Sequence, residues 1–302
     1  MRRWHMLIFL LLGVVLVLPT TAVADNGPHQ GDFNPTTDAC AGCHRAHRGQ
    51  TDSLLVESSQ SALCYSCHGT GASGADTNVQ DGVWEGAQGT GQGLRGGGFD
   101  FAVMDPEADG NPVSGSTTSV HDIEVAGTVW GHGSVSSTAN PGKADVVLQC
   151  GSCHNPHGIT GGDAYRILRP KPKDSDAAQE VLVPDDQTKI YTISYTNNNY
   201  RDHTYLDGKN ISQWCAQCHT RYLAGDTQDT GDAIFKHGHV TDDNSRKCMA
   251  CHVAHGTSAV MDGAYSSAVE WPDGSPPQSG TQNSRLLSVN NRGVCYQCHE
   301  SP

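Results

Sequence analysis

Hydrophobic positions in this chain rarely follow a helical or strand period. After the first two dozen residues, no segment repeats apolar side chains at either spacing over a length that could fill an interior. Residues 189–196, where Ile190, Ile193 and Tyr195 lie among polar neighbours, predict one short strand. The stretch from Gly69 to Gly98 is rich in Gly, Ala, Ser, Thr and Gln and predicts an irregular surface loop. Helix and strand together are therefore expected to cover a minority of residues.

The N-terminal 24 residues have the pattern of a secretory signal peptide. Arg2 and Arg3 precede an apolar run from Leu7 to Leu18, and Ala22-Val23-Ala24 forms a small-x-small cleavage site. The run is short and wrongly flanked for a spanning helix, although an uncleaved anchor is the alternative. Residues 1–24 are predicted to be removed, leaving 25–302 as one exported domain without a membrane span.

The composition is poor in material for an ordinary hydrophobic core. Of 302 residues, 36% are hydrophobic and 6% aromatic, and there are 35 glycines and 14 prolines. Something other than side chains must help to hold the chain together. The net charge of −13 argues against nucleic acid as a partner, because such proteins need a basic surface.

The cysteines indicate that a bound group supplies the missing apolar material. All twelve fall in pairs separated by two residues, and a histidine follows each pair directly. Two thiols one helical turn apart can add to the two vinyl groups of a porphyrin edge, which places the next histidine under the iron as its proximal ligand. We therefore predict six covalently bound haem c groups. The six motifs are Cys40, Cys43, His44; Cys64, Cys67, His68; Cys150, Cys153, His154; Cys215, Cys218, His219; Cys248, Cys251, His252; and Cys295, Cys298, His299.

Other uses of paired cysteines explain the pattern less well. A zinc ribbon gives no reason for a histidine after every second cysteine. Thioredoxin-type redox motifs need strand–helix units that this sequence does not offer. A disulfide scaffold, expected first for an exported protein, is disfavoured because cysteines three apart make poor cross-links over long loops.

The sixth iron ligand decides whether such haems conduct electrons or bind substrate. Nine further histidines follow the signal peptide, but only Met104, Met249 and Met261 remain as methionines, so histidine–methionine ligation cannot be general. Two histidines on each iron close both axial positions. This favours an electron carrier, and we predict that the chain is not an enzyme.

Three of these histidines extend their motif to C-x-x-C-H-x-x-H. His47, His157 and His255 each lie three residues after a proximal histidine, on the same side of a helical turn. None can reach the opposite face of its own haem, so we predict that each ligates a different haem. The doubled motifs are the first, third and fifth, which divides the chain into three doubled-plus-plain pairs.

The remaining distal ligands are predicted less directly. His121 and His239 each precede a doubled motif and are reasonable candidates. His29, His132, His203 and His237 compete for the sixth place, and we add His132 to the predicted set. The fold class expected is a multihaem c-type cytochrome, mostly irregular coil with short helices and little strand, wrapped around a continuous haem stack whose porphyrins replace the missing apolar side chains.

The motifs and their surroundings resemble a known family. The residues that carry the resemblance are Cys150 to Gly158, Tyr165 to Leu168, Ile211 to Cys215, and Gly238-His239 before Cys248. They are similar to those of the OmcS-like family of hexahaem extracellular filament cytochromes, over all six motifs. The resemblance implies a continuous haem chain in subunits that polymerise into a conductive filament, with His47 of one copy on the haem of His252 in the adjacent subunit.

Further partners and a location follow from the same resemblance. We expect other multihaem cytochromes as electron donors, external electron acceptors, and a place outside the cell or on its outer surface. The alternatives are a monomeric electron shuttle in the periplasm and a multihaem reductase. A reductase would need an open or lysine-ligated iron, but the sequence contains no C-x-x-C-K and a surplus of histidine.

Overall fold

The computed structural model describes about half of the chain, in eleven segments. They comprise residues 29, 40–72, 74–86, 91–105, 110–133, 143–158, 164–173, 175–184, 208–222, 248–261 and 284–293. The predicted signal peptide, the predicted strand at 189–196 and the sixth motif lie outside these residues, as do His203, His237 and His239.

The regular elements are short and most described residues belong to none. The α-helices are α3 (Gln60–His68), α4 (Cys150–Cys153) and α5 (Gly208–Cys215), and the 3-10 turns are η1 (Tyr165–Ile167), η3 (Thr220–Tyr222), η5 (Cys248–Ala250) and η6 (Asn290–Arg292). The strands are β1 (Thr77–Asn78), β2 (Val83–Trp84), β3 (Phe101–Met104), β4 (Val113–Ser116), β5 (Ser119–Val120), β6 (Ala126–Val129), β7 (Lys143–Val147) and β8 (Gly256–Thr257). The expected fold class, coil with short helices and little strand, is confirmed for these segments.

The strands pair only in twos. All four ladders are antiparallel, and they join β1 to β2, β3 to β4, β5 to β8, and β6 to β7. The β5–β8 ladder is the one that joins distant parts of the sequence, since it pairs Ser119 with Thr257 and Val120 with Gly256. It brings the segment that carries His121 beside the one that carries His255.

The segment from Gly69 to Gly98 is more ordered than the sequence suggested. It contains the β1–β2 ladder, and both Asn78 and Leu94 are buried. The Asn78 side-chain amide donates to the carboxylates of Asp81 (2.8 Å) and Glu85 (2.9 Å). The prediction of an irregular surface loop was therefore wrong here. Hydrogen bonds between polar side chains hold this segment together, and such bonds leave no hydrophobic periodicity in the sequence.

Side-chain cores are small, as the composition predicts. One cluster of buried residues lies where β3 meets the fifth motif, and a second lies between η1 and α5. The first consists of Ala102, Met104, Val253, Met261, Leu287 and Val289, and the second of Tyr165, Val183 and Ile211. Cysteines of the motifs pack against both clusters, Cys251 against the first and Cys215 against the second.

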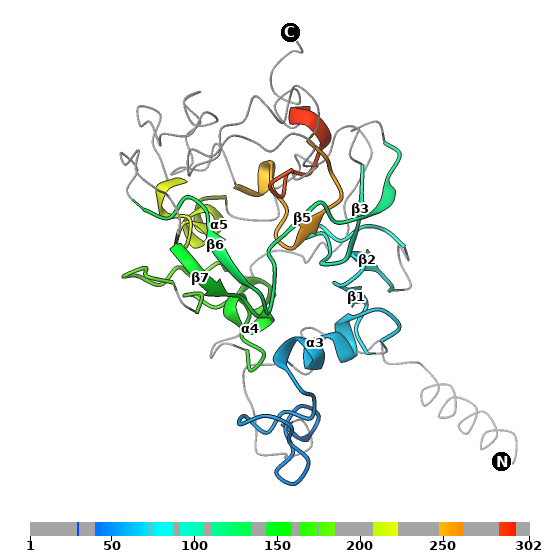
Figure 1. Ribbon diagram of the computed structural model, residues 1–302, viewed down its shortest axis with the longest axis vertical. Coiled ribbons are helices and arrows are strands. Elements are labelled where there is room, and N and C mark those ends of the chain that lie inside the picture. The colour runs from blue at the N-terminus through cyan, green and yellow to red at the C-terminus, as the bar shows by residue number, and fades with distance from the viewer. Residues whose placement is uncertain are drawn as a thin grey trace, which may run out of the picture.

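The described motifs follow one another along the long axis of the molecule (Figure 1). The first motif lies at the lower end in blue, α3 and α4 lie above it, and α5 and the orange fifth motif lie higher still. No helix among the described residues is long and apolar enough to cross a membrane.

Candidate functional site

Each of the five described C-x-x-C-H motifs forms a tight turn. The backbone N–H of the histidine donates to the carbonyl of the first cysteine, at 2.9 Å for His44, 3.0 Å for His154, 3.1 Å for His219 and 3.0 Å for His252. The second motif forms the last turn and a half of α3, whose N-terminus is capped by Ser59. None of the ten described cysteines forms a disulfide. The turn presents two thiols and one imidazole together, as thioether attachment requires.

A short strap crosses the proximal histidine in each of the three doubled motifs. The straps are Ser53-Leu54-Leu55, Arg166-Ile167-Leu168 and Arg285-Leu286-Leu287, and the third residue of each forms an isolated bridge with the proximal histidine. The first carbonyl of each strap accepts a hydrogen bond from the histidine Nδ1, at 2.8, 2.8 and 3.0 Å. The middle residue has a left-handed backbone, with φ of 57°, 51° and 63°.

Two backbone hydrogen bonds complete each strap. The middle carbonyl accepts from the N–H of the residue after the proximal histidine, at 2.9 Å in the first motif, 2.8 Å in the third and 2.9 Å in the fifth. The N–H of the residue after the strap donates to the carbonyl of the second cysteine, at 3.0, 2.8 and 2.9 Å. The three straps are therefore copies of one local structure, a repeat that the sequence patterns did not predict.

Backbone carbonyls fix the tautomer of most of the described histidines near these motifs. Besides the three proximal histidines under the straps and His132, whose Nδ1 donates to the Cys218 carbonyl at 3.2 Å, four further histidines donate from Nδ1 to a carbonyl. These are His29 to Pro156 (2.8 Å), His68 to Thr77 (3.2 Å), His121 to Ala254 (2.6 Å) and His219 to Trp130 (2.6 Å). A carbonyl can only accept, so the proton lies on Nδ1 and Nε2 is left for a metal.

The histidine rings come together in four pairs. Two imidazoles on opposite sides of one metal ion, with metal–nitrogen bonds of about 2.0–2.1 Å, have ring centres about 6–6.5 Å apart. The four pairs have centre distances and interplanar angles of 6.3 Å and 21° for His29–His68, 5.9 Å and 15° for His44–His157, 6.1 Å and 47° for His121–His219, and 6.3 Å and 58° for His154–His255. Each pair combines one proximal histidine with one histidine from elsewhere in the chain.

The extra histidines of the third and fifth motifs lie against other motifs, and their ligation of other haems stays a prediction. His157 of the third motif stacks with His44 of the first, and His255 of the fifth lies against His154 of the third. His29, which the sequence left among four competitors, pairs with His68, and His121 pairs with His219. His47 is exposed on the loop after the first motif.

The distal histidines of the plain motifs are tied to the doubled motifs. Nδ1 of His29 donates to the carbonyl of Pro156, directly before His157, and Nδ1 of His121 donates to the carbonyl of Ala254, directly before His255. The third motif therefore contributes to the ring pairs of the first, second and third motifs. The fifth motif contributes to those of the third and fourth.

Cysteines of successive motifs lie next to each other. A side-chain hydrogen bond joins Cys64 to Cys150, lowering the pKa of Cys150 to about 7 and raising that of Cys64. Cys215 and Cys248 are joined in the same way, and the pKa of Cys248 falls to about 7. The third and fourth motifs are also neighbours, because Cys218 adds to burial in raising the pKa of Cys153 to about 12.

The helices that carry these cysteines are linked by backbone-to-side-chain hydrogen bonds. The N–H of Gly151 in α4 donates to Gln60 Oε1 in α3 at 2.7 Å, and the N–H of Cys248 donates to the buried Ser212 hydroxyl of α5 at 3.3 Å. Between α3 and residues 120–124 lies a cavity of about 370 Å³, lined in part by Ser61, Tyr65 and Phe99. Ser61 also lies 3.8 Å from Cys150 Sγ, so the cavity adjoins an attachment cysteine.

Burial favours the neutral form of the buried imidazoles near the later motifs. It is the main reason that the pKa of His219 falls to about 4 and that of His255 to about 3, and it lowers the pKa of His68 and His154 as well. Only a neutral imidazole can offer Nε2 to a metal. The paired thiols, the neutral imidazoles and their spacing fit covalently attached haem with two histidines on the iron.

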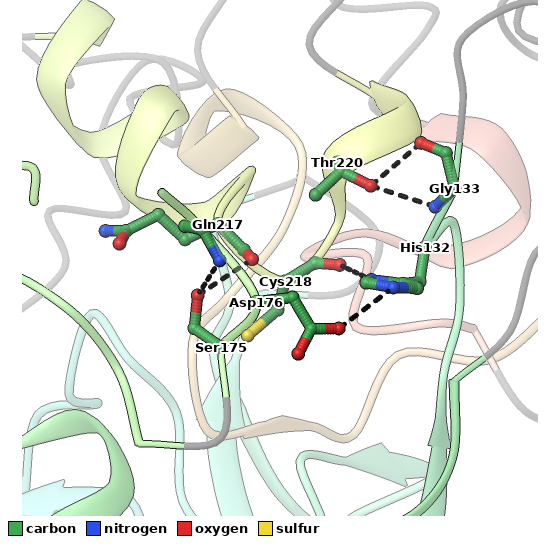
Figure 2. A network of polar contacts seen from close by, with 8 residues as sticks. His132, Gly133, Ser175, Asp176, Gln217, Cys218 and Thr220 are labelled. Atoms are coloured by element: carbon green, nitrogen blue, oxygen red, sulfur yellow. Dashed lines mark hydrogen bonds and ion pairs between the residues drawn. The ribbon is translucent and has the colours of Figure 1, made fainter. Parts of the chain in front are cut away.

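His132 lies in a polar network beside the fourth motif (Figure 2). Its Nδ1 donates to the carbonyl of Cys218 (3.2 Å), and its Nε2 lies 3.3 Å from Oδ2 of Asp176. The next residue, Gly133, exchanges hydrogen bonds of 2.9 and 2.8 Å with the Thr220 hydroxyl. Both ring nitrogens of His132 thus have partners in the chain, and its assignment as an iron ligand stays a prediction. The same holds for His239 and for Cys295, Cys298 and His299, outside the described residues.

One segment of the chain matches a known family model. Residues 34–73, which contain the first two motifs, match the family model described as "Doubled CXXCH motif". The first two motifs of the chain are therefore similar to a doubled C-x-x-C-H unit.

A solved structure is similar as well. It is the Outer Membrane Cytochrome S Filament from Geobacter Sulfurreducens, with 16% sequence identity, coverage of 90% of this chain and 99% of that chain, and a TM-score of 0.39. No curated protein sequence matches the chain.

Proposed function

We propose that this protein transfers electrons outside the cytoplasm along a line of six haems, each held by two histidines, and that it polymerises into a filament. The observation that carries this proposal is the order of the ligand pairs. The first five motifs are neighbours in chain order, and each later doubled motif supplies a ligand to the odd-numbered motif before it. This connectivity favours a continuous line over isolated haems.

The residues perform three tasks in such a line. When bound, haem supplies one-electron chemistry at iron. The paired imidazoles would hold the iron from both sides, so that little rearrangement would accompany a change of its charge. The Nδ1–carbonyl bonds hold each imidazole in one tautomer and orientation. The contacts between cysteines of successive motifs keep neighbouring attachment sites adjacent, and electron transfer needs such short distances between haems.

The repeat of two motifs supports polymerisation. The extra histidine of the third motif pairs with the proximal histidine of the first, and the extra histidine of the fifth pairs with the proximal histidine of the third. Extending this rule, the proximal histidine of the fifth motif, His252, needs an extra histidine from a seventh. The first motif of a second copy would supply it through His47, which is exposed and forms no ring pair with another histidine of the described residues.

Several finer points belong to the same proposal. The chain is an electron carrier and not an enzyme, since histidines on both sides of an iron leave no open position for substrate. The signal-peptide pattern supports export, and the family resemblance supports the cell exterior or outer surface. Other multihaem cytochromes and external acceptors are the partners that this role requires.

A haem count combined with particle size tests the proposal. We expect the purified, exported protein to carry six haems by pyridine haemochrome assay, to be low-spin, and to form filaments by electron microscopy. Six low-spin haems in particles of monomer mass would favour the monomeric shuttle. A stoichiometric high-spin signal in the wild type would instead favour a reductase.

A further inference from the structure

The loop of the first doubled motif is basic and exposed. Arg45 and Arg48 flank the extra histidine His47 in the sequence, and all three residues are exposed. Together with Gln50 and Val56, the two arginines line a hollow of about 290 Å³, here named the Arg45–Arg48 hollow. Neither guanidinium forms an ion pair with a carboxylate of the described residues. Within that part of the chain, the positive charge of the hollow is therefore uncompensated.

Hydrogen bonds hold the hollow in shape. The backbone N–H of Arg45 donates to the carbonyl of Leu54 at 2.9 Å, and its Nε donates to the carbonyl of Ala41 at 3.3 Å. Gln50 Nε2 donates to the carbonyl of Val56 at 2.5 Å. A hollow that is formed before binding loses little conformational freedom when a partner enters it.

The other two doubled motifs have neutral residues at these positions. The residues in place of Arg45 and Arg48 are Asn155 and Gly158 in the third motif and Val253 and Gly256 in the fifth. Both glycines are buried, and a Cβ at Gly256 would overlap the carbonyl oxygen of Gly98. The third and fifth motifs thus pack this part of the loop inside the chain, whereas the first exposes two charged side chains there. This difference favours an anionic partner over packing into the chain's own core.

An acidic segment lies beside the fifth motif. Asp122 and Glu124 are exposed, and neither forms an ion pair with a lysine or arginine of the described residues. Residues 117–142 contain no lysine or arginine. His121, directly before Asp122, donates its backbone N–H to the carbonyl of His255 at 2.8 Å, which holds the segment against the fifth motif. The fifth motif therefore has exposed carboxylates next to it.

Charge decides which surfaces of two copies attract each other. The net charge of −13 makes two copies repel over most of their surface. Attraction is strongest where a basic hollow on one copy meets exposed carboxylates on the other. A planar guanidinium can also donate two hydrogen bonds to one carboxylate, which fixes the orientation of the contact.

We propose that the Arg45–Arg48 hollow is a docking surface for a second copy of this chain, where it binds the carboxylates of Asp122 and Glu124. The inference rests on the proposed function, in which His47 ligates the iron of His252 in that copy. Both contacts belong to one interface, because the arginines flank His47 and the carboxylates adjoin the motif of His252. Docking through charges brings His47 to the iron and makes assembly depend on salt, which screens such attraction.

A salt series on the holoprotein tests this. The screening length falls from about 30 Å at about 0.01 M salt to about 3 Å at about 1 M, so wild-type filaments should need a higher protein concentration at high salt. At low salt, Arg45→Glu/Arg48→Glu should raise the concentration needed by at least about tenfold, because like charges then face each other. Arg45→Lys/Arg48→Lys keeps the charge and should assemble. Lys171→Glu/Lys173→Glu changes the net charge equally at exposed positions elsewhere and should match the wild type.

An exchange of charges identifies the partner surface. Asp122→Arg/Glu124→Arg alone should block assembly, and its combination with Arg45→Glu/Arg48→Glu should restore filaments in electron micrographs. All these variants keep every C-x-x-C-H motif and ligand histidine, so six haems should stay attached. If Arg45→Glu/Arg48→Glu assembles at the wild-type concentration, or the combined variant does not assemble, the inference is overturned, while wild-type filaments leave the proposed function in place. A wild type that forms no filament at any salt concentration would overturn polymerisation itself.

Discussion

At the scale of single residues, the partner of each extra histidine depends partly on local spacing and partly on the path of the chain. His157 and His255 lie within three residues of a proximal histidine, yet the structure places each against the proximal histidine of another motif. Spacing alone predicts that neither histidine pairs with the proximal histidine of its own motif, because two side chains on one side of a turn cannot reach both faces of one porphyrin. Which proximal histidine becomes the partner depends on the path of the chain between motifs, and local spacing does not determine that path.

Replacement of His157 by Ala tests the assignment at this scale. We expect six haems to remain attached, because every C-x-x-C-H motif is intact. The haem of His44 should lose its distal ligand and give one high-spin, five-coordinate iron per chain, measured by electron paramagnetic resonance. Lys171→Ala, a change of an exposed side chain after the third motif, is the control and should stay low-spin. A fully low-spin His157→Ala protein would contradict the pairing.

A second test concerns a glycine next to the ligand segment. Gly97 has φ of 69°, and a Cβ there would overlap the carbonyl oxygen of Gly256. Gly91 has φ of 84°, but a Cβ there would meet no atom within 4 Å, which makes Gly91→Ala the matched control. Left-handed backbone costs an alanine about 1–2 kcal/mol at either site. Overpacking should destabilise Gly97→Ala by about 1–3 kcal/mol more, measured by urea unfolding. Equal losses would contradict the contact.

At the scale of elements, the chain builds short pieces and fastens them to one another at the motifs. The helix α3 carries the second motif, and its residues Gln60 and Ser61 contact Gly151 and Cys150 of the third. Ser212 of α5 receives the N–H of Cys248 from the fifth. The helices α3 and α5 therefore each hold attachment cysteines of their own motif and also contact the following motif.

The N-cap of α3 provides a test of this dependence. The Ser59 hydroxyl accepts a hydrogen bond of 3.1 Å from the Ala62 N–H, and loss of such a cap costs about 1 kcal/mol. We expect Ser59→Ala to lower the free energy of unfolding by that amount, with Ser58→Ala, an exposed position outside the helix, near the wild type. Thermal denaturation followed by circular dichroism measures both. An unchanged Ser59→Ala would show that attached groups, and not the cap, hold the helix.

Some elements could be predicted from the sequence and others could not. The motif turns and the scarcity of regular structure follow from local spacing and composition. The straps do not, because they return to their histidines after 9, 12 and 33 residues and share only a pattern of two aliphatic residues after Ser53, Arg166 or Arg285. The β1–β2 ladder has two-residue strands, too short for any periodicity. The stacking of Phe99 on His255 could not be predicted, because the two residues are distant in sequence.

At the scale of the whole molecule, the arrangement is a line with a repeat of two motifs. In Figure 1 the described motifs follow the long axis in sequence order, and the first lies at one end. The third motif contributes to its own ring pair and to those of the first and second motifs, and the fifth motif contributes to those of the third and fourth. His47, the extra histidine of the first motif, is exposed, and in the proposed filament it would reach a second copy.

Replacement of His47 by Ala separates assembly from haem binding. We expect six attached haems and a folded monomer, because His44 keeps its strap and its pairing with His157. Filaments should be lost or much shortened in electron micrographs, and the iron of His252 should become five-coordinate, since its distal ligand would come from the neighbouring copy. His157→Ala is the matched control: it removes a distal histidine inside the chain but leaves His47, and it should still assemble. Filaments of normal length from His47→Ala would mean that subunits join without a shared iron ligand, and a low-spin His47→Ala protein would mean that another side chain of the same chain completes the iron of His252.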